Sequence, residues 1–223
     1  MATRARSGLH GVQINYFAVF SDISLNMVIV LIFFLFCQFL ASSKGLVRVM
    51  VESRQRQIEK EVTSALGEDQ RYLTVVTNGN LQRLRFSDAI LFDAGRDELK
   101  ETGERVLQTV GGALLKRIEW VVEVQIEGHT DTRPIKTARF PSNWELSSAR
   151  ATRVVRFFQD RVGFNPVAQP LSATGRSQYV PAGDGKFPSS SPVVRTSGSD
   201  SDAISRRVEI VLVYSEKTDK HKK

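Results

Sequence analysis

The first apolar segment of the chain is long, continuous and poor in charge. Residues 16–41 contain no Lys, Arg or Glu, and Leu, Ile, Phe and Val dominate from Met27 to Leu40. At 1.5 Å per residue, a helix over this stretch would be roughly 39 Å long, enough to cross a bilayer with some tilt. A signal peptide has a shorter apolar core and a small-residue cleavage site, and Ala41-Ser42-Ser43 is a poor one. The pattern predicts an uncleaved membrane helix behind a polar leader at residues 1–15.

The next stretch, residues 42–70, mixes many charges with apolar positions at helical spacing. Those positions are Leu46, Val49, Met50, Ile58, Val62 and Leu66. This pattern predicts a helical stalk, which either associates with another helix along its apolar stripe or is a solvated helix.

From residue 71 the pattern is that of a folded domain. Two β-rich runs flank the turn pair Asn78-Gly79 and predict a hairpin. Further segments alternate between types: helices at 97–117 and 143–161, strands at 120–126, 171–174 and 206–214, and a Gly, Ser and Pro-rich loop at 183–201. This alternation predicts an α/β sandwich, one mixed sheet with helices packed on it, over residues 71–215. A basic tail follows at residues 216–223.

Composition narrows the function. With 41% apolar and 25% charged residues most of the chain should fold, and the net charge of +7 is scattered without an aromatic-basic stripe. We therefore expect a surface facing anionic lipid or wall polymer and no nucleic acid. The single cysteine, Cys37, excludes an intrachain disulfide and a cysteine metal cluster. No nucleophile, base and acid set, metal-ligand spacing or phosphate loop is evident, so we predict no enzyme, metal or cofactor.

One acidic residue, Asp22, lies inside the predicted membrane helix. It has no Lys or Arg in the apolar stretch to pair with, and an unpaired charge there costs several kcal/mol. The usual role of such a residue is to relay protons or ions. Asn26 follows one turn later on the same face and could line the same polar stripe. The alternative is that Asp22 is an interfacial residue near the lipid headgroups.

Three motifs in the second half of the chain carry a resemblance. Gly128-His129-Thr130-Asp131 follows a predicted strand, Asn143-Trp144-Glu145-Leu146-Ser147-Ser148-Ala149-Arg150-Ala151 opens a helix, and Arg206-Arg207-Val208-Glu209-Ile210 opens the last strand. Upstream, Phe92-Asp93-Ala94-Gly95 fits the opening of the same pattern. Over roughly residues 84–214 the chain resembles the OmpA-like peptidoglycan-binding family. Ser205 replaces an Asn that the family often has before the final Arg pair, which removes one expected loop contact.

The resemblance implies a ligand, the diamino acid of the peptidoglycan stem peptide. It implies that Asp131 binds the ammonium group and that Arg150 binds the carboxylate through paired hydrogen bonds. Asn143 should brace the loop, Leu146 should face the core or the site wall, and Thr130 and Arg207 are possible supporting residues. The alternative is an internal ion pair between Asp131 and Arg150.

An OmpA-like domain behind an acid-bearing membrane helix resembles the MotB family of stator B subunits. The resemblance implies an ion-conducting role for Asp22, with a proton as the expected ion, a homodimer, and a surrounding ring of polytopic MotA-like subunits. It also implies a bacterial inner-membrane protein with a cytoplasmic N-terminus and a periplasmic domain, although the flanking charges give no clear orientation. The short connection between Leu40 and Phe92 resembles ZorB of Zorya antiphage systems, with a ZorA partner. A flagellar stator and a passive wall anchor are the alternatives.

Overall fold

The computed structural model describes residues 16–180 and 205–215, and the chain divides into two compact units between Leu46 and Val47. The predicted leader, the loop at 183–201 and the basic tail lie outside the described residues. Helix α1 runs over Tyr16–Leu66, and large apolar side chains from Phe20 to Phe39 are exposed in it. No helix within the described ranges combines the length and the apolar character needed to cross a membrane. The membrane span expected at residues 16–41 therefore stays a prediction.

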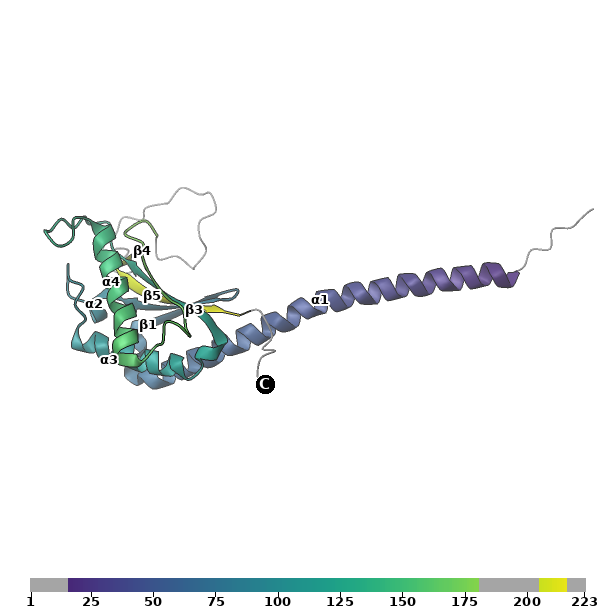
Figure 1. The fold of residues 1–223 in the computed structure, drawn as a ribbon, viewed down its shortest axis with the longest axis horizontal. Helices are drawn as coiled ribbons and strands as arrows, with labels where there is room; N and C mark the ends of the chain where they lie inside the picture. Colours follow the sequence, from purple (N-terminus) through teal and green to yellow (C-terminus); the bar gives the residue numbers. More distant parts are fainter. Residues whose placement is uncertain (1–15, 181–204, 216–223) are drawn as a thin grey trace, which may run out of the picture. The chain divides into compact units, whose positions relative to one another are not determined.

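The second unit contains one five-stranded mixed sheet with helices α3 and α4 along it (Figure 1). The strand order is β1-β2-β5-β3-β4. The strands are β1 Leu73–Asn78, β2 Leu81–Ser87, β3 Val121–His129, β4 Leu171–Gly175 and β5 Arg207–Tyr214. The helices after α1 are α2 Asp88–Leu91, α3 Glu101–Leu115 and α4 Asn143–Phe157, with short helical segments at Gly67–Tyr72, Ile118–Trp120 and Phe158–Val162.

The hairpin expected at the start of the domain is confirmed. Strands β1 and β2 pair antiparallel, and Asn78 lies opposite Leu81, so that Gly79 and Asn80 form a two-residue connection. Gly79 has a φ of +58°, a left-handed conformation that tight hairpin turns require and that glycine adopts without steric cost.

Strand β5 lies between β2 and β3, and its two faces differ in chemistry. Its even-numbered side chains, Val208, Ile210, Leu212 and Tyr214, belong to the apolar core. Its odd-numbered residues point to the opposite face, because successive side chains of a strand alternate. Arg207 and Glu209 on that face form a buried ion pair of 2.6 Å. The β3–α4–β4 segment completes the sheet at the β4 edge, with β3 and β4 parallel and α4 as the crossover helix between them.

The C-terminal part of α1 contributes to the core of the second unit. Val51, Ile58, Val62 and Leu66 are buried in the same apolar cluster as the sheet. The Gln55 amide donates to the Gly79 carbonyl at 3.0 Å, and Gln82 of β2 donates back to the Gln55 carbonyl at 3.0 Å. Three positions of the apolar stripe predicted for the stalk, Ile58, Val62 and Leu66, thus pack into the core of this chain's own domain, whereas Val49 and Met50 are exposed. The compact unit begins at Val47.

Candidate functional site

The start of α4 positions the motif residues on one helical face. Ser142 is the N-cap: its hydroxyl oxygen accepts a hydrogen bond from the Trp144 backbone N–H at 3.2 Å and donates to the Glu145 carboxylate. This Ser-x-x-Glu arrangement is a capping-box sequence, which fixes where the helix begins. Residues three, four and seven positions apart then share a face, and four of them are buried: Asn143, Leu146, Ser147 and Arg150.

The loop after β3 lies against this face of α4. A Cβ added at Gly128 would lie 2.2 Å from the Ser147 carbonyl oxygen, so the Gly-His-Thr-Asp motif needs glycine for close packing of strand and helix. The Thr130 backbone N–H donates to the Ser177 carbonyl at 3.0 Å. The Thr130 hydroxyl is buried and has no partner among the described residues. The following residue, Asp131, is also buried.

Asn143 holds this loop in place, as the motif predicts. Its side-chain nitrogen donates to the Asp131 carbonyl at 3.2 Å, the Arg133 carbonyl at 3.0 Å and Gln178 Oε1 at 3.2 Å. Its side-chain oxygen accepts from the Ile135 backbone N–H at 3.2 Å. One buried amide therefore joins the β3 loop to the segment after β4.

Arg150 is paired with a residue that the sequence did not indicate. Its Nη1 lies 2.9 Å from Asp88 Oδ2, at the start of α2. Its Nε and Nη2 donate to the carbonyls of Arg96 at 2.8 Å and Asp93 at 3.1 Å, and its guanidinium carbon lies 5.2 Å from the Phe92 ring centroid. The partners lie 54 or more positions from Arg150 in the sequence, so no local pattern could have predicted them.

Asp131 is paired with two cations other than Arg150. Its Oδ2 lies 2.6 Å from Arg133 Nη2 and 3.1 Å from Arg206 Nη1. Direct ion pairing between Asp131 and Arg150, the alternative considered from the sequence, is absent from the salt bridges of the described residues. We call Asp88, Asp131, Arg150 and Arg206 the loop-end cluster. Arg206 could have been found from the sequence, because it opens the Arg-Arg-Val-Glu-Ile motif.

Burial and, to a smaller extent, Asp131 raise the pKa of Asp88, Arg150 and Arg206 lower it, and the net result is a pKa of about 6. Burial also lowers the pKa of Arg150, although Asp88 and Asp131 raise it. Asp88 Oδ1 is buried and has no hydrogen-bond partner among the described residues. The loop-end cluster thus holds two carboxylates and two guanidinium groups that influence one another, with one carboxylate oxygen left unsatisfied.

Arg207 belongs to a different group of charges. It pairs with Glu209, donates to the Ser205 carbonyl at 3.2 Å and is 4% exposed. Glu209 also lies 2.9 Å from Arg85 and 3.0 Å from Arg83. We call the charges on this face of the sheet the sheet-face cluster: Arg83, Arg85, Glu127, His129, Arg176, Arg207 and Glu209. Arg207 therefore supports the fold of the last strand.

Three members of the sheet-face cluster could together ligate a metal: Glu127, His129 and Glu209. One ligand atom from each lies within 4.8 Å of the other two. Arginines already pair with both carboxylates. Arg176 lies 2.6 Å and Arg83 3.2 Å from Glu127, and Glu209 has the arginine partners described above. Burial raises the pKa of Glu127, but His129, Arg176 and Arg83 outweigh it and bring the pKa to about 2. A metal cation would have to displace guanidinium groups from a cluster with more cations than anions, so these residues fit a metal poorly.

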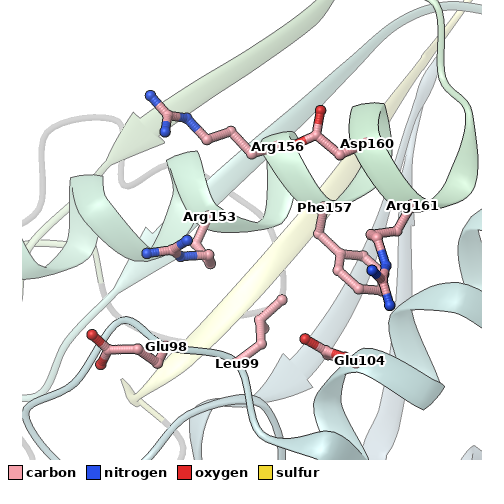
Figure 2. A pocket seen from close by; sticks show the side chains of 8 residues that line it. All are labelled: Glu98, Leu99, Glu104, Arg153, Arg156, Phe157, Asp160 and Arg161. Atoms are coloured by element: carbon pink, nitrogen blue, oxygen red, sulfur yellow. The ribbon is translucent and has the colours of Figure 1, made fainter.

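A cavity of about 500 Å³ lies between the segment before α3 and the second half of α4 (Figure 2). Leu99 and Phe157 line it together with three acids and three arginines: Glu98, Glu104, Asp160, Arg153, Arg156 and Arg161. The three acids and three arginines balance in charge, and none of the site residues predicted from the sequence lines this cavity. Asp22 and Asn26, the two residues predicted to act in a membrane, both lie in α1 of the first unit.

Residues 91–194 match the model of the OmpA family. The chain is 32% identical over 170 residues to the uncharacterized protein YtxE of Bacillus subtilis, a match that covers 75% of this chain and 63% of YtxE. It is 26% identical over 163 residues to motility protein B of the same bacterium, covering 73% of this chain and 56% of that protein. The chain therefore spans less than two thirds of either relative.

Two solved structures resemble the fold. A MotB-like protein from Desulfovibrio vulgaris has a TM-score of 0.61 and 29% sequence identity, and the match covers 76% of this chain and 99% of that one. The cell wall anchor of the T6SS from Pseudomonas aeruginosa has a TM-score of 0.54 and 27% identity, covering 69% and 97% of the two chains. The expected α/β domain is thereby confirmed. The chain carries an OmpA-like domain. Its similarity to motility protein B and to the MotB-like structure supports a relationship with the MotB/OmpA-like family.

Proposed function

We propose that this protein is the B subunit of an ion-driven membrane motor, anchored to peptidoglycan by its OmpA-like domain. The observation that carries the anchoring half is the loop-end cluster, in which buried acids and guanidinium groups lie next to the motif loop. Its resemblance to the family's diamino-acid site supports Arg150 as the ligand for a carboxylate and Asp131 as the ligand for an ammonium group.

Ligand binding at Asp131 requires an exchange of partners. Arg133 and Arg206 both contact this carboxylate, and their side chains are 65% and 37% exposed. An exposed guanidinium loses little free energy when it leaves an ion pair, because water solvates it well. Arg133 can therefore move away while the ligand ammonium takes its place. Asn143 keeps the Asp131 backbone fixed during this exchange.

The membrane half of the proposal rests on α1. A helix with large apolar side chains exposed from Phe20 to Phe39 is costly in water and suited to lipid. In this proposal Asp22 carries the ion, most simply a proton, and Asn26 lines the same path. A homodimer of this chain would lie within a ring of MotA-like or ZorA-like subunits in the inner membrane, N-termini in the cytoplasm and OmpA-like domains in the periplasm.

The motor we favour is a Zorya-type antiphage motor, because the connection between the predicted span and the domain is short. A flagellar stator is the second candidate, favoured by the similarity to motility protein B. A passive wall anchor is the third, favoured by the similarity to the cell wall anchor of the T6SS.

Activity of Asp22→Asn in cells separates these candidates. With a MotA-like or ZorA-like partner co-expressed, both phage protection and swimming are scored, and membrane levels of the protein are measured as the control. Loss of phage protection supports the defence motor, and loss of swimming supports the flagellar stator. If Asp22→Asn keeps full activity in both assays, ion conduction through Asp22 is wrong and the passive anchor remains.

Arg150→Ala tests the anchoring half and should release the protein from the wall. Because this change leaves Asp88 buried without its cation, Asp88→Asn/Arg150→Gln serves as a second variant with the charge pair removed together. Both should fail to sediment with purified peptidoglycan. A folded double variant that sediments like the wild type contradicts the assignment of Arg150.

A further inference from the structure

The sheet of the second unit has two edges, and one of them is the strand β1. Among the described strands, β1 pairs only with β2. An edge strand presents backbone N–H and C=O groups to any further strand that can reach them. Proteins usually protect such an edge with a charged side chain, a proline or a bulge. Strand β1, with the sequence Leu-Thr-Val-Val-Thr-Asn and a continuous register, has none of these.

The hairpin register determines which backbone groups of β1 face outward. Asn78 lies opposite Leu81 across a two-residue turn, so these two form a hydrogen-bonded pair, and such pairs recur at every second residue. The backbone groups of the even-numbered residues of β1 therefore face β2, and those of the odd-numbered residues face away from the sheet. Among the described residues, no hydrogen bond reaches the outward groups of Val75 or Thr77.

The side chains of β1 leave this edge accessible. Thr74, Thr77 and Asn78 are exposed, and Val75 and Val76 are half-buried. Threonine and valine are β-branched, the type of residue that is favoured in a paired strand. Because the strand carries no charge, two copies of it would not place like charges opposite each other. The edge thus combines unsatisfied backbone groups with an absence of repulsion against a copy of itself.

A second copy of β1 can satisfy both outward residues in one antiparallel register. If Val76 lies opposite Val76 of the second copy, Val75 lies opposite Thr77, and each of these pairs exchanges two backbone hydrogen bonds. This register leaves the Leu73 N–H with its present acceptor, the Gln70 carbonyl. A register centred on Val75 would instead place Leu73 opposite Thr77 and compete for that N–H. The register centred on Val76 is therefore the one that fits the strand.

We propose that β1 is an interface between two copies of this chain, which pair antiparallel about a two-fold axis at Val76 and join their sheets into one. The pairing is isologous, since each copy contributes the same strand. A contact of one strand pair is small for a stable dimer in dilute solution. Two chains held at one membrane or one wall polymer meet at a high effective concentration, which allows a small interface to form.

This inference goes beyond the proposed motor, because the interface needs only the folded second unit. It would give the proposed homodimer a contact between the two OmpA-like domains in addition to any contact between membrane helices. It also applies to a passive wall anchor, in which two domains would bind the wall side by side.

Disulfide trapping in cells that express the full-length chain tests the register. Every variant also carries Cys37→Val, because Cys37 is the single native cysteine. The cells are oxidised before lysis, and the chains are separated without reductant. Val76→Cys should link two copies, since residues opposite each other in a non-hydrogen-bonded pair have Cα atoms about 4.5 Å apart, within the range of disulfides.

Thr74→Cys is the matched control on the same face of β1. In the proposed register its two copies lie roughly 13 Å apart, at about 3.3 Å per residue. Val76→Cys should therefore form the covalent dimer at least roughly tenfold faster than Thr74→Cys. Random collisions predict the opposite order, because Thr74 is exposed and Val76 is half-buried. Thr74→Cys expressed together with Asn78→Cys should crosslink, since the register places these two positions opposite each other.

Thr77→Pro tests the backbone hydrogen bonds. The Thr77 N–H faces away from β2, so proline there leaves the chain's own sheet paired, as edge strands tolerate. Combined with Val76→Cys, Thr77→Pro should lower the crosslinked fraction about tenfold, because it removes a donor from each copy and blocks close approach. Thr77→Val keeps the N–H and should keep the crosslink. Circular dichroism of the purified variants checks that the fold is retained.

Each outcome decides the proposal. Crosslinking of Thr74→Cys as fast as Val76→Cys overturns it, since that would show contact without register. A Val76→Cys chain that stays monomeric overturns a second copy as the occupant of the edge. A folded Thr77→Pro variant that crosslinks like Thr77→Val also overturns it. None of these results bears on ion conduction or wall binding, which the variants of Asp22 and Arg150 test separately.

Discussion

The loop-end cluster and the sheet-face cluster use the same chemistry, carboxylates paired with arginines, in two different settings. In the sheet-face cluster Glu127, His129 and Glu209 have side chains no more than 3% exposed, and the carboxylates are satisfied by arginines. At the loop-end cluster, Asp131 is neutralised by Arg206 and by the neighbouring Arg133, whose side chains are 37% and 65% exposed. Buried charges that satisfy one another stabilise one arrangement of a fold, whereas a buried acid with exposed partners can exchange them for a ligand.

The largest expected loss of stability follows substitution of Glu209 in the sheet-face cluster. Glu209→Ala leaves Arg83, Arg85 and Arg207 without a shared carboxylate, and breaking a buried ion pair costs roughly 3–5 kcal/mol. Chemical denaturation of the full chain followed by circular dichroism should record this loss. Glu104→Ala, at an exposed position of α3, is the control and should change stability far less. A loss below about 1 kcal/mol for Glu209→Ala would mean that the sheet-face cluster is not structural.

Glu127 gives the sheet-face cluster a characteristic dependence on pH. Its pKa is lowered from 4.5 to about 2, so its ionised form stabilises the fold above pH 4.5 and this contribution is lost as the pH falls towards 2. The loss is on the order of 3 kcal/mol. Wild type and Glu127→Gln should therefore converge in unfolding free energy across this range. Parallel curves would contradict the ion pairing of Glu127.

Asp88 gives the loop-end cluster the opposite dependence. Its pKa is raised from 3.8 to about 6, so the folded protein favours the protonated carboxyl. The stability gained from this form is fully present below pH 3.8 and is lost as the pH rises through 6. The wild type should lose somewhat less than 3 kcal/mol between pH 4 and 7 relative to Asp88→Asn. Unfolding free energies measured over this range check the sign. A wild type that gains stability relative to Asp88→Asn as the pH rises would show that Arg150 overcomes the cost of burial.

The smallest expected effect on stability comes from Arg133. Its ion pair with Asp131 is largely exposed on the arginine side, so Arg133→Ala should change the unfolding free energy by less than about 1 kcal/mol. Peptidoglycan binding should persist or strengthen, because one competitor for Asp131 is gone. Sedimentation with purified peptidoglycan measures this. If Arg133→Ala no longer binds peptidoglycan, Arg133 contacts the ligand and does not compete with it for Asp131.

The sequence predicted the features that local pattern encodes. The Asn78-Gly79 turn, the strands around it and the capped start of α4 follow from turn chemistry, alternation and helical spacing. The motif also predicted that Asn143 braces the loop, and its hydrogen bonds to Ile135 and Asp131 agree with that, while its part in peptidoglycan binding stays a prediction. These features depend on residues close together in sequence or on a recognisable motif.

Contacts between distant segments could not be predicted from the sequence. The partner of Arg150 is Asp88, and the pairing exists only because α2 and α4 are brought together by the sheet. Residues 42–70 carried an apolar stripe, but periodicity does not reveal what covers it, and Ile58 and Val62 pack into the domain core. Arg83 of β2 is only 8% exposed, and its neutralising partners Glu127 and Glu209 come from β3 and β5, far away in the sequence.

The most direct test of the central claim is sedimentation of the full-length chain with purified peptidoglycan, comparing the wild type with Asp131→Asn. This change keeps the shape of the side chain, removes its charge and replaces one acceptor oxygen with an NH2 donor. We predict that the wild type pellets with the peptidoglycan and that Asp131→Asn stays in the supernatant with an unchanged melting temperature. If a folded Asp131→Asn protein pellets as the wild type does, the loop-end cluster is not the wall-binding site.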